Sequence, residues 1–291
     1  MTGRSSLDWI RGLFVIMVVT SMGCRDQDRG HVSATDENSV AVAERRRVHD
    51  FWSDFREATQ LRLDGNFEAA REAYDRALEN NPEHEDALYY LGNVNLELGN
   101  WKDARAAWQR LVEVNPSSSR AFSQLGSLAL CRPEIPAFDL EAARSAFESA
   151  HRLNPEETGP TLRLGQVALL EKRAAEAAHF FDAVTGSNFT SLESRYLKAY
   201  TEWLGGRGDE GLQELNRIIA ETKSLPQPPV MGEGDTKTGR RLGPSGEAGC
   251  PLFEPFIEAM EGAARPLGRE VFPHFEELLR VLAAGSSDSS R

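Results

Sequence analysis

The chain has 291 residues, a length that ordinarily predicts about two domains. Acidic residues outnumber basic ones by 45 to 33, which gives a formal net charge of −12 at pH 7, and no segment combines clustered Lys and Arg with aromatic residues. This charge balance argues against nucleic acid as a partner.

The first 23 residues have the shape of a secretory signal. Arg4 and Arg11 make the start of the chain positive, and an uninterrupted apolar run follows from Leu13 to Val19. A transmembrane helix needs about 20 apolar residues, so this run is too short to span a bilayer. Residues 1–23 are therefore predicted to be a signal peptide.

Gly23-Cys24, at the end of this segment, resembles the lipobox of bacterial lipoproteins. The resemblance implies that Cys24 carries a lipid and that the exported protein is anchored to a bacterial membrane, facing the periplasm or the cell exterior. Ser21 and Met22 depart from the residues that the family prefers, so an uncleaved anchor and ordinary secretion stay open. Residues 24–43 contain little that can be buried and are expected to form a flexible tether.

From residue 51 to residue 222 the chain repeats a pattern of small, apolar and proline positions with a period of about 34 residues. The two strongest copies contain Ala58, Leu61, Gly65, Phe67, Ala70, Tyr74, Ala77 and Pro82, and then Leu88, Leu91, Gly92, Gly99, Trp101, Ala104, Trp108 and Pro116. This pattern is similar to that of the tetratricopeptide repeat family. The resemblance implies an all-α, right-handed superhelical solenoid that binds partners and is not an enzyme.

Three weaker copies follow the two strong ones. The third contains five extra residues around Pro133 to Pro136, and the fourth has Phe189 where the turn proline belongs. The fifth keeps Ala199, Gly206, Leu215 and Ile218. We expect a solenoid over residues 44–222, with helix pairs at about 51–84, 85–118, 119–157, 158–190 and 191–222.

Small residues on both helices of a pair have a predicted packing role. A glycine within a helix costs about 1 kcal/mol relative to alanine but lets a second helix approach closely. Gly92, Gly126 and Gly165 fall on first helices. On the second helices an alanine precedes, by four residues, an aromatic side chain that is expected to fill the space between the helices. These alanine and aromatic positions are Ala70 and Tyr74, Ala104 and Trp108, Ala143 and Phe147, and Ala177 and Phe181.

The C-terminal part lacks the repeat pattern. Residues 223–250 are rich in Gly and Pro and predict a linker. Residues 251–284 contain two amphipathic stretches, which are expected either to cap the last repeat or to dock a partner. Residues 285–291 are expected to be a disordered tail. Cys131 and Cys250 either form a disulfide, which would hold the linker to the solenoid, or pack separately.

The family resemblance implies a binding groove lined by the first helices, through the second, fifth, sixth, ninth and twelfth positions of each repeat. The residues so selected are Trp52, Phe55, Arg56, Thr59, Asp86, Tyr89, Tyr90, Asn93, Arg120, Ser123, Gln124, Ser127, Arg163, Gln166, Tyr196, Tyr200 and Trp203. Tyr89 stands where family members that grip a C-terminal carboxylate have Lys, so that clamp is not expected. Tyr, Trp and Arg together are typical of an interaction hot spot, although burial by neighbouring segments would also explain the terminal aromatics.

No arrangement of residues in the sequence predicts catalysis, a cofactor or a metal site. Gly234 to Arg240 has the spacing of a phosphate loop, but Arg240 replaces the required Lys. The six histidines are scattered, without a helical zinc-site spacing. We therefore expect a scaffold or adaptor that binds a protein or peptide. The alternative is an accessory subunit that delivers a substrate to an enzyme or to a secretion or envelope-assembly complex.

Overall fold

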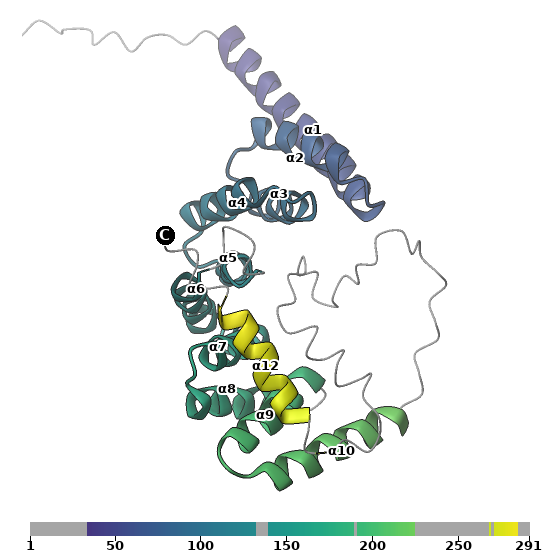
Figure 1. The fold of residues 1–291 in the computed structure, drawn as a ribbon. Coiled ribbons are helices and arrows are strands. Elements are labelled where there is room, and N and C mark those ends of the chain that lie inside the picture. Colours follow the sequence, from purple (N-terminus) through teal and green to yellow (C-terminus); the bar gives the residue numbers. More distant parts are fainter. Residues whose placement is uncertain (1–33, 132–138, 189–190, 225–267, 269–270, 285–291) are drawn as a thin grey trace, which may run out of the picture. The chain divides into compact units, whose positions relative to one another are not determined.

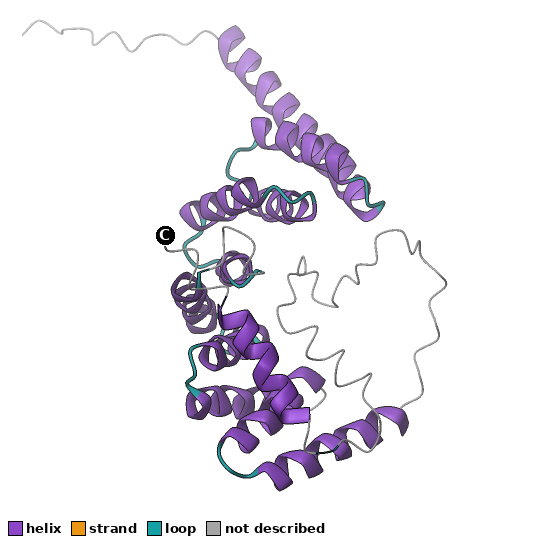
Figure 2. Ribbon diagram, viewed as in Figure 1, coloured by secondary structure: helices purple, strands orange, loops and turns teal. Residues whose placement is uncertain are grey.

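The computed structural model describes residues 34–131, 139–188, 191–224, 268 and 271–284 (Figure 1). Within these ranges all regular structure is helical, and short loops join most consecutive helices (Figure 2). The helices are α1 (Ala34–Leu63), α2 (Phe67–Asn80), α3 (Glu85–Glu97), α4 (Trp101–Val114), α5 (Ser119–Ala129), α6 (Leu140–Leu153), α7 (Thr158–Leu170), α8 (Ala174–Ser187), α9 (Leu192–Leu204), α10 (Gly208–Ser224) and α12 (Val271–Ala284).

The chain divides into two units, residues 1–44 and 45–291. Of the first unit the structure describes residues 34–44, and these are helical. The flexible tether predicted through residue 43 is therefore wrong from Ala34 onward. Its composition explains the error, because residues 34–43 are polar enough to stay solvated yet contain no Gly or Pro to end a helix, and Asp36 and Glu37 suit a helix N-terminus.

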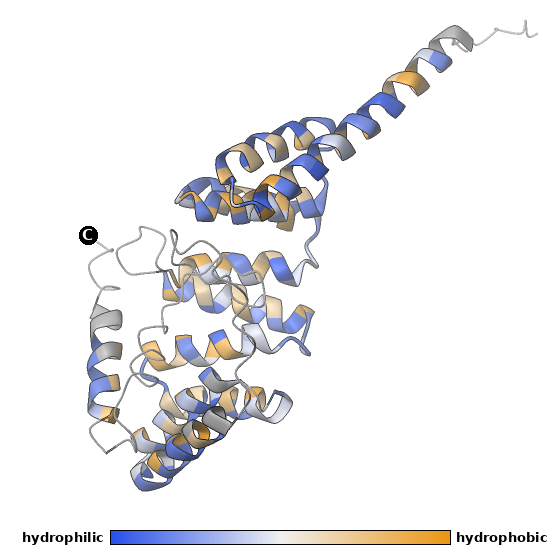
Figure 3. Cartoon of the chain, turned by 90° about the vertical axis from the view of Figure 1, so that its right-hand side faces the viewer, coloured by the Kyte–Doolittle hydropathy of each residue, from blue (hydrophilic) through white to orange (hydrophobic). Residues whose placement is uncertain are grey.

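The second unit is built from helix pairs, and each helix from α2 to α9 packs against the next in sequence. In the first pair, the Thr59 hydroxyl on α1 lies 3.3 Å from the Tyr74 hydroxyl on α2, and the rings of Phe55 and Tyr74 meet edge to face. In Figure 3 hydrophobic and hydrophilic stretches alternate along the helices, as expected of amphipathic helices that share their apolar sides. The expected all-α solenoid of five pairs with an additional C-terminal helix is confirmed.

Glycine and aromatic residues join the two helices of the middle pairs. A Cβ atom added to Gly92 would lie 2.2 Å from Trp108 Nε1, which itself donates a hydrogen bond of 3.2 Å to the Tyr89 carbonyl. A Cβ atom added to Gly126 would lie 2.8 Å from the Phe147 ring. The predicted role of these glycines is thus confirmed, because only a residue without Cβ admits the ring so closely.

The longest connection within the array joins α5 to α6. The Asp139 N–H donates a 2.8 Å hydrogen bond to the Ala129 carbonyl, so the two ends of the connection meet. The Asp139 carboxylate also accepts from the Ala142 N–H and caps α6. The extra residues around Pro133 to Pro136 lie outside the described residues.

Turns between the two helices of a pair use the left-handed backbone region. Gly65, Gly99 and Gly206 occupy it with φ of 75°, 77° and 83°. In the fourth pair the same position is held by Lys172, with φ of 61°. This conformation costs a residue with a side chain roughly 1–2 kcal/mol, so the fourth turn is strained.

The C-terminal helix α12 packs on α7 and α9. Val271, Phe272, Phe275 and Leu279 form its buried side and join one apolar cluster with the last repeats. Among the described helices, none has both the length and the apolar character that crossing a membrane requires. The linker beyond Ser224, the first amphipathic stretch of the C-terminal part and the tail at 285–291 lie outside the described residues.

Candidate partner-binding surface

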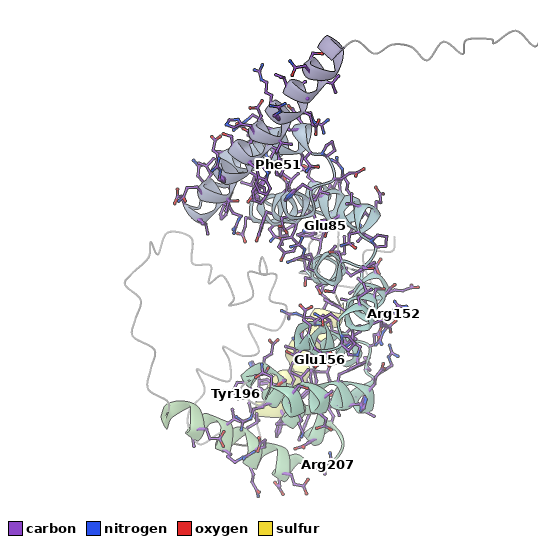
Figure 4. The ribbon with its side chains drawn as sticks, turned by 180° about the vertical axis from the view of Figure 1, so that it is seen from behind. Phe51, Glu85, Arg152, Glu156, Tyr196 and Arg207 are labelled. Atoms are coloured by element: carbon purple, nitrogen blue, oxygen red, sulfur yellow. The ribbon has the colours of Figure 1, made fainter. Side chains whose placement is uncertain are left out.

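The expected groove residues on the first helices of the pairs, α1, α3, α5, α7 and α9, define a surface that we name the A face. At its N-terminal end Trp52 is 47% exposed and lies beside Phe51 and Phe55, with ring centroids 5.0 and 5.9 Å away. The His84 ring, at the start of α3, lies 4.5 Å from Phe51, which is labelled in Figure 4. Arg56 is exposed next to this cluster.

Tyrosine and arginine side chains continue the A face over α3 and α5. The Arg62 guanidinium lies 4.5 Å from the Tyr90 ring centroid, and that of Arg120 lies 4.9 Å from the Tyr89 centroid. Gln124 Nε2 donates a 3.0 Å hydrogen bond to the Tyr89 hydroxyl. These cation–π and hydrogen-bond contacts connect successive first helices and leave Tyr89 and Tyr90 half-buried.

Several buried polar atoms on this part of the A face have no hydrogen-bond partner within the described residues. Asn93 and Gln124 are only 8% and 2% exposed. A buried polar atom without a partner costs about 1–3 kcal/mol, so such atoms are rare and call for a ligand or ordered water. Of the six such side-chain atoms, five come from α1, α3 and α5: Arg62 Nε, Asn93 Oδ1, Ser123 Oγ, Gln124 Oε1 and Ser127 Oγ.

Arg62 was absent from the sequence-based set. Arg62 occupies the twelfth position of the first repeat, as Trp203 does in the fifth, so the repeat pattern could have identified it as a groove residue. The structure brings it together with Tyr90 of the second repeat.

In the fourth repeat the expected groove residues are engaged within the chain. Arg163 Nη1 donates a 2.9 Å hydrogen bond to Gln166 Oε1, and Gln166 Nε2 donates to the Glu193 carboxylate of α9. Arg163 also lies 3.8 Å from the same carboxylate. This network joins α7 to α9, and the role of Arg163 and Gln166 as partner contacts stays a prediction.

In the fifth repeat the expected partner contacts belong to the core. Tyr196 and Tyr200 are 2% and 1% exposed. Trp203 stacks on Phe272 of α12, with centroids 5.2 Å apart and planes at 13°, and Phe275 meets Tyr200 edge to face at 6.0 Å. In this structure α12 therefore covers the A face of the fifth repeat, and the role of these three residues as partner contacts stays a prediction.

Burial under α12 affects the acidity of the Tyr200 hydroxyl. Removal from water, and to a smaller extent the nearby Glu276 carboxylate of α12, raise the pKa of the Tyr200 hydroxyl well above its ordinary value.

Two further expectations concern cysteines and metals. Cys131 is fully buried and disulfide-bonded. Cys24 and Cys250 lie outside the described residues, so the pairing of Cys131 with Cys250 and the lipid at Cys24 stay predictions. In the part of the chain that the structure describes, no group of His, Cys, Asp and Glu gathers as metal ligands do.

Comparison with known proteins agrees with the helix pairs. A family model described as tetratricopeptide repeat matches residues 55–119, 95–134 and 139–189. These stretches are similar to tetratricopeptide repeats. The matches begin in α1 and reach the end of the fourth pair, so the fifth pair and α12 lie outside them. No curated protein matches the chain.

Solved tetratricopeptide structures are similar to most of the array. MamA protein is 19% identical, with a TM-score of 0.54, over 62% of this chain and 98% of that one. A tetratricopeptide repeat protein from Parabacteroides merdae ATCC 43184 is 18% identical, with a TM-score of 0.54, over 60% of this chain and 68% of that one. YrrB, described as having an unusual peptide-binding site, is 22% identical, with a TM-score of 0.51, over 64% and 92%. These TM-scores show a shared fold, and at such low identities they show the fold alone.

Proposed function

We propose that the chain is a protein–protein interaction scaffold or adaptor that holds a peptide or a segment of a partner protein on the A face of its first three repeats. The observation that carries this proposal is the set of buried polar atoms on α1, α3 and α5 that find no hydrogen-bond partner among the described residues. Peptide backbone groups, which donate and accept hydrogen bonds, match that mixture of guanidinium, amide and hydroxyl groups.

The surrounding side chains support the same site. Exposed Trp52 and half-buried Tyr89 and Tyr90, with Arg120 beside them, provide large rigid contact area of the kind that dominates binding energy at interfaces. The similarity to YrrB supports a peptide as the ligand class. Repeats of this kind typically serve as non-catalytic scaffolds, and we propose no reaction for this chain.

The binding proposal is tested by replacing Trp52, Tyr89 and Arg120 with alanine together. We expect a peptide selected on the wild-type protein from a displayed library to bind the triple variant about tenfold or more weakly, because these groups form the centre of the contact. The matched control replaces exposed residues of α4, a second helix, and should bind as wild type does: Lys102, Gln109 and Glu113 to alanine. Equal binding by a folded triple variant would refute the proposal.

We further propose that the protein is exported and held on the outer side of a bacterial membrane by a lipid on Cys24. The signal-like segment before Cys24 supports export, and the disulfide at Cys131 suits an oxidising compartment. Labelled fatty acid should enter the wild-type protein and the Cys250→Ser control in a bacterial host, but not Cys24→Ser. Label retained by Cys24→Ser would rule out this anchor.

A further inference from the structure

The C-terminal helix occupies the part of the A face that the repeat pattern assigns to partners. In Figure 1, α12 crosses in front of α7 and α9, and it packs against both. Tyr200 and Trp203, at the ninth and twelfth positions of the fifth repeat, meet the rings of Phe272 and Phe275. A terminal cap is needed only over the last helix, which here is α10, so contact with two first helices exceeds that requirement.

The side of α12 that is buried has the spacing of a helix docked in a groove. Phe272, Phe275 and Leu279 follow one another by three and four residues and are buried. His274 and Glu277, on the opposite side, are exposed. Amphipathic helices that bind grooves of other proteins place their anchors at this i, i+3, i+7 spacing. The α7–α9 surface is therefore shaped and lined for such a helix.

The connection of α12 to the array allows exchange. Residues 225–270 separate it in sequence from α10, which ends at Ser224. A segment joined through a chain of this length competes with an outside ligand at an effective concentration on the order of millimolar. Beneath α12, the contacts among Arg163, Gln166 and Glu193 link α7 to α9 directly.

We propose that α12 is a displaceable occupant of a second binding surface, on α7 and α9. The ligand of this surface is an amphipathic helix of a partner protein with the pattern aromatic-x-x-aromatic-x-x-x-Leu. This surface is distinct from the peptide site on the first three repeats. While α12 is docked, the second surface is closed, and a partner helix opens it by taking the place of α12.

The test uses the full chain and a fluorescent peptide with the sequence of residues 268–284. Phe272→Ala and Phe275→Ala together remove the two ring anchors of the internal helix while leaving α7 and α9 unchanged. We expect the peptide to bind this double variant about tenfold or more tightly than wild type, because the internal competitor is weakened. The matched control, His274→Ala with Glu277→Ala, alters only exposed residues of α12 and should bind as weakly as wild type. A peptide that lacks both phenylalanines should not bind.

Three results would overturn the proposal. The first is a folded double variant that binds the peptide no better than wild type. The second is loss of the helical array in the double variant, shown by circular dichroism, since α12 would then be a structural cap. The third comes from hydrogen exchange of the wild-type protein. We expect the backbone amides of α12 to exchange faster than those of α7. If the amides of both helices exchange only through global unfolding, release of α12 is excluded.

Discussion

At the scale of single residues, the absence of one carbon atom determines how closely the helices of a pair approach. Gly126 faces the Phe147 ring, and a methyl group there would lie 2.8 Å from Phe147 Cε1. Phe147 is buried and has little room to move. The sequence predicted this contact because the glycine and the aromatic residue each keep a fixed place in the repeat.

We therefore expect Gly126→Ala to lower the free energy of unfolding by about 1–3 kcal/mol through overpacking. Gly186 is the matched control, since it is also helical but a Cβ atom there would meet nothing within 4 Å. Gly186→Ala should leave stability unchanged or raise it by up to about 1 kcal/mol. Urea unfolding measures the free energy of unfolding of both variants. Equal stability of Gly126→Ala and wild type would contradict the packing argument.

The strained turn at Lys172 gives a prediction in the opposite direction. Replacement by Gly should raise the free energy of unfolding by roughly 0.5–1 kcal/mol, because relief of the left-handed conformation exceeds the entropy cost of glycine. The reciprocal change, Gly99→Lys, introduces the strain at the equivalent turn and should destabilise. Thermal unfolding measures both changes, and the argument fails if Lys172→Gly is the less stable protein.

His84 links stability to pH. Its Nδ1 accepts a 3.2 Å hydrogen bond from the Ala87 N–H and caps α3, which requires the neutral ring. Burial lowers the pKa of His84 from its ordinary 6.5, and Arg120 also lowers it, although Asp86 and Glu85 oppose the shift. Because the folded-state pKa is depressed, the stabilisation is complete above pH 6.5 and is lost as pH falls through the folded-state pKa.

We expect wild type to lose about 1 kcal/mol of stability relative to His84→Asn when pH is lowered from about 7.5 to about 5. Asparagine caps a helix at any pH in this range, so the variant isolates the titration of the ring. Chemical unfolding at both pH values gives the difference. A difference that is constant with pH would exclude His84 as its source.

At the scale of helices, the fifth pair has the glycine and alanine positions of the second to fourth pairs exchanged between its two helices. Its first helix has Ala199 where α3, α5 and α7 have glycine, and its second helix has Gly211 where the other second helices have alanine. A Cβ atom on Gly211 would lie 2.5 Å from the Ala199 carbonyl oxygen. The closest approach has thus moved from an aromatic ring against a first helix to the backbone of α9 against α10.

Gly211→Ala is accordingly expected to destabilise by about 1–3 kcal/mol, since backbone moves less readily than a side chain. Gly206→Ala is unsuitable for comparison because of its positive φ, so Gly186→Ala again serves as the control. Guanidinium unfolding is the measurement. A Gly211→Ala protein that keeps wild-type stability would show that α10 shifts freely on α9.

The helix pairs were predictable because their small, apolar and aromatic residues recur at fixed spacing. The errors lie in segments where this repeat pattern stops or departs from its usual residues. Residues 34–43 are helical although their polar composition suggested a tether. Tyr196 and Tyr200 carry the pattern of exposed groove residues, but burial by α12 depends on contact between segments far apart in sequence. The left-handed turn at Lys172 could not be predicted, because lysine stands there where the first, second and fifth pairs have glycine.

At the scale of the whole molecule, the apolar cores extend across pair boundaries. One cluster runs from Ala129 of α5 to Leu279 of α12, and another joins α1 to α5. Each pair is thus stabilised by its neighbours, as in other repeat arrays. Cys131 lies just after α5, so its disulfide ties the middle of the array to a segment outside the described residues.

We expect reduction of this disulfide to lower the free energy of unfolding by about 2–4 kcal/mol, since the bond restricts the unfolded chain. Cys131→Ala should be insensitive to reductant and serves as the control. Mass spectrometry of a non-reduced digest then identifies the partner, which we predict to be Cys250. A peptide pair containing Cys24 would contradict both that prediction and the lipid anchor.

The exchange of glycine for alanine in the fifth pair limits modular engineering of this protein. A chimera that joins α9 to α8 would press the Ala177 methyl group toward the Ala199 carbonyl, where the native chain has Gly211. A chimera that joins α7 to α10 would set Gly165 against Leu215 and leave a void. Single helices of the fourth and fifth pairs are therefore not interchangeable. A consensus sequence derived from all five repeats would lose this difference.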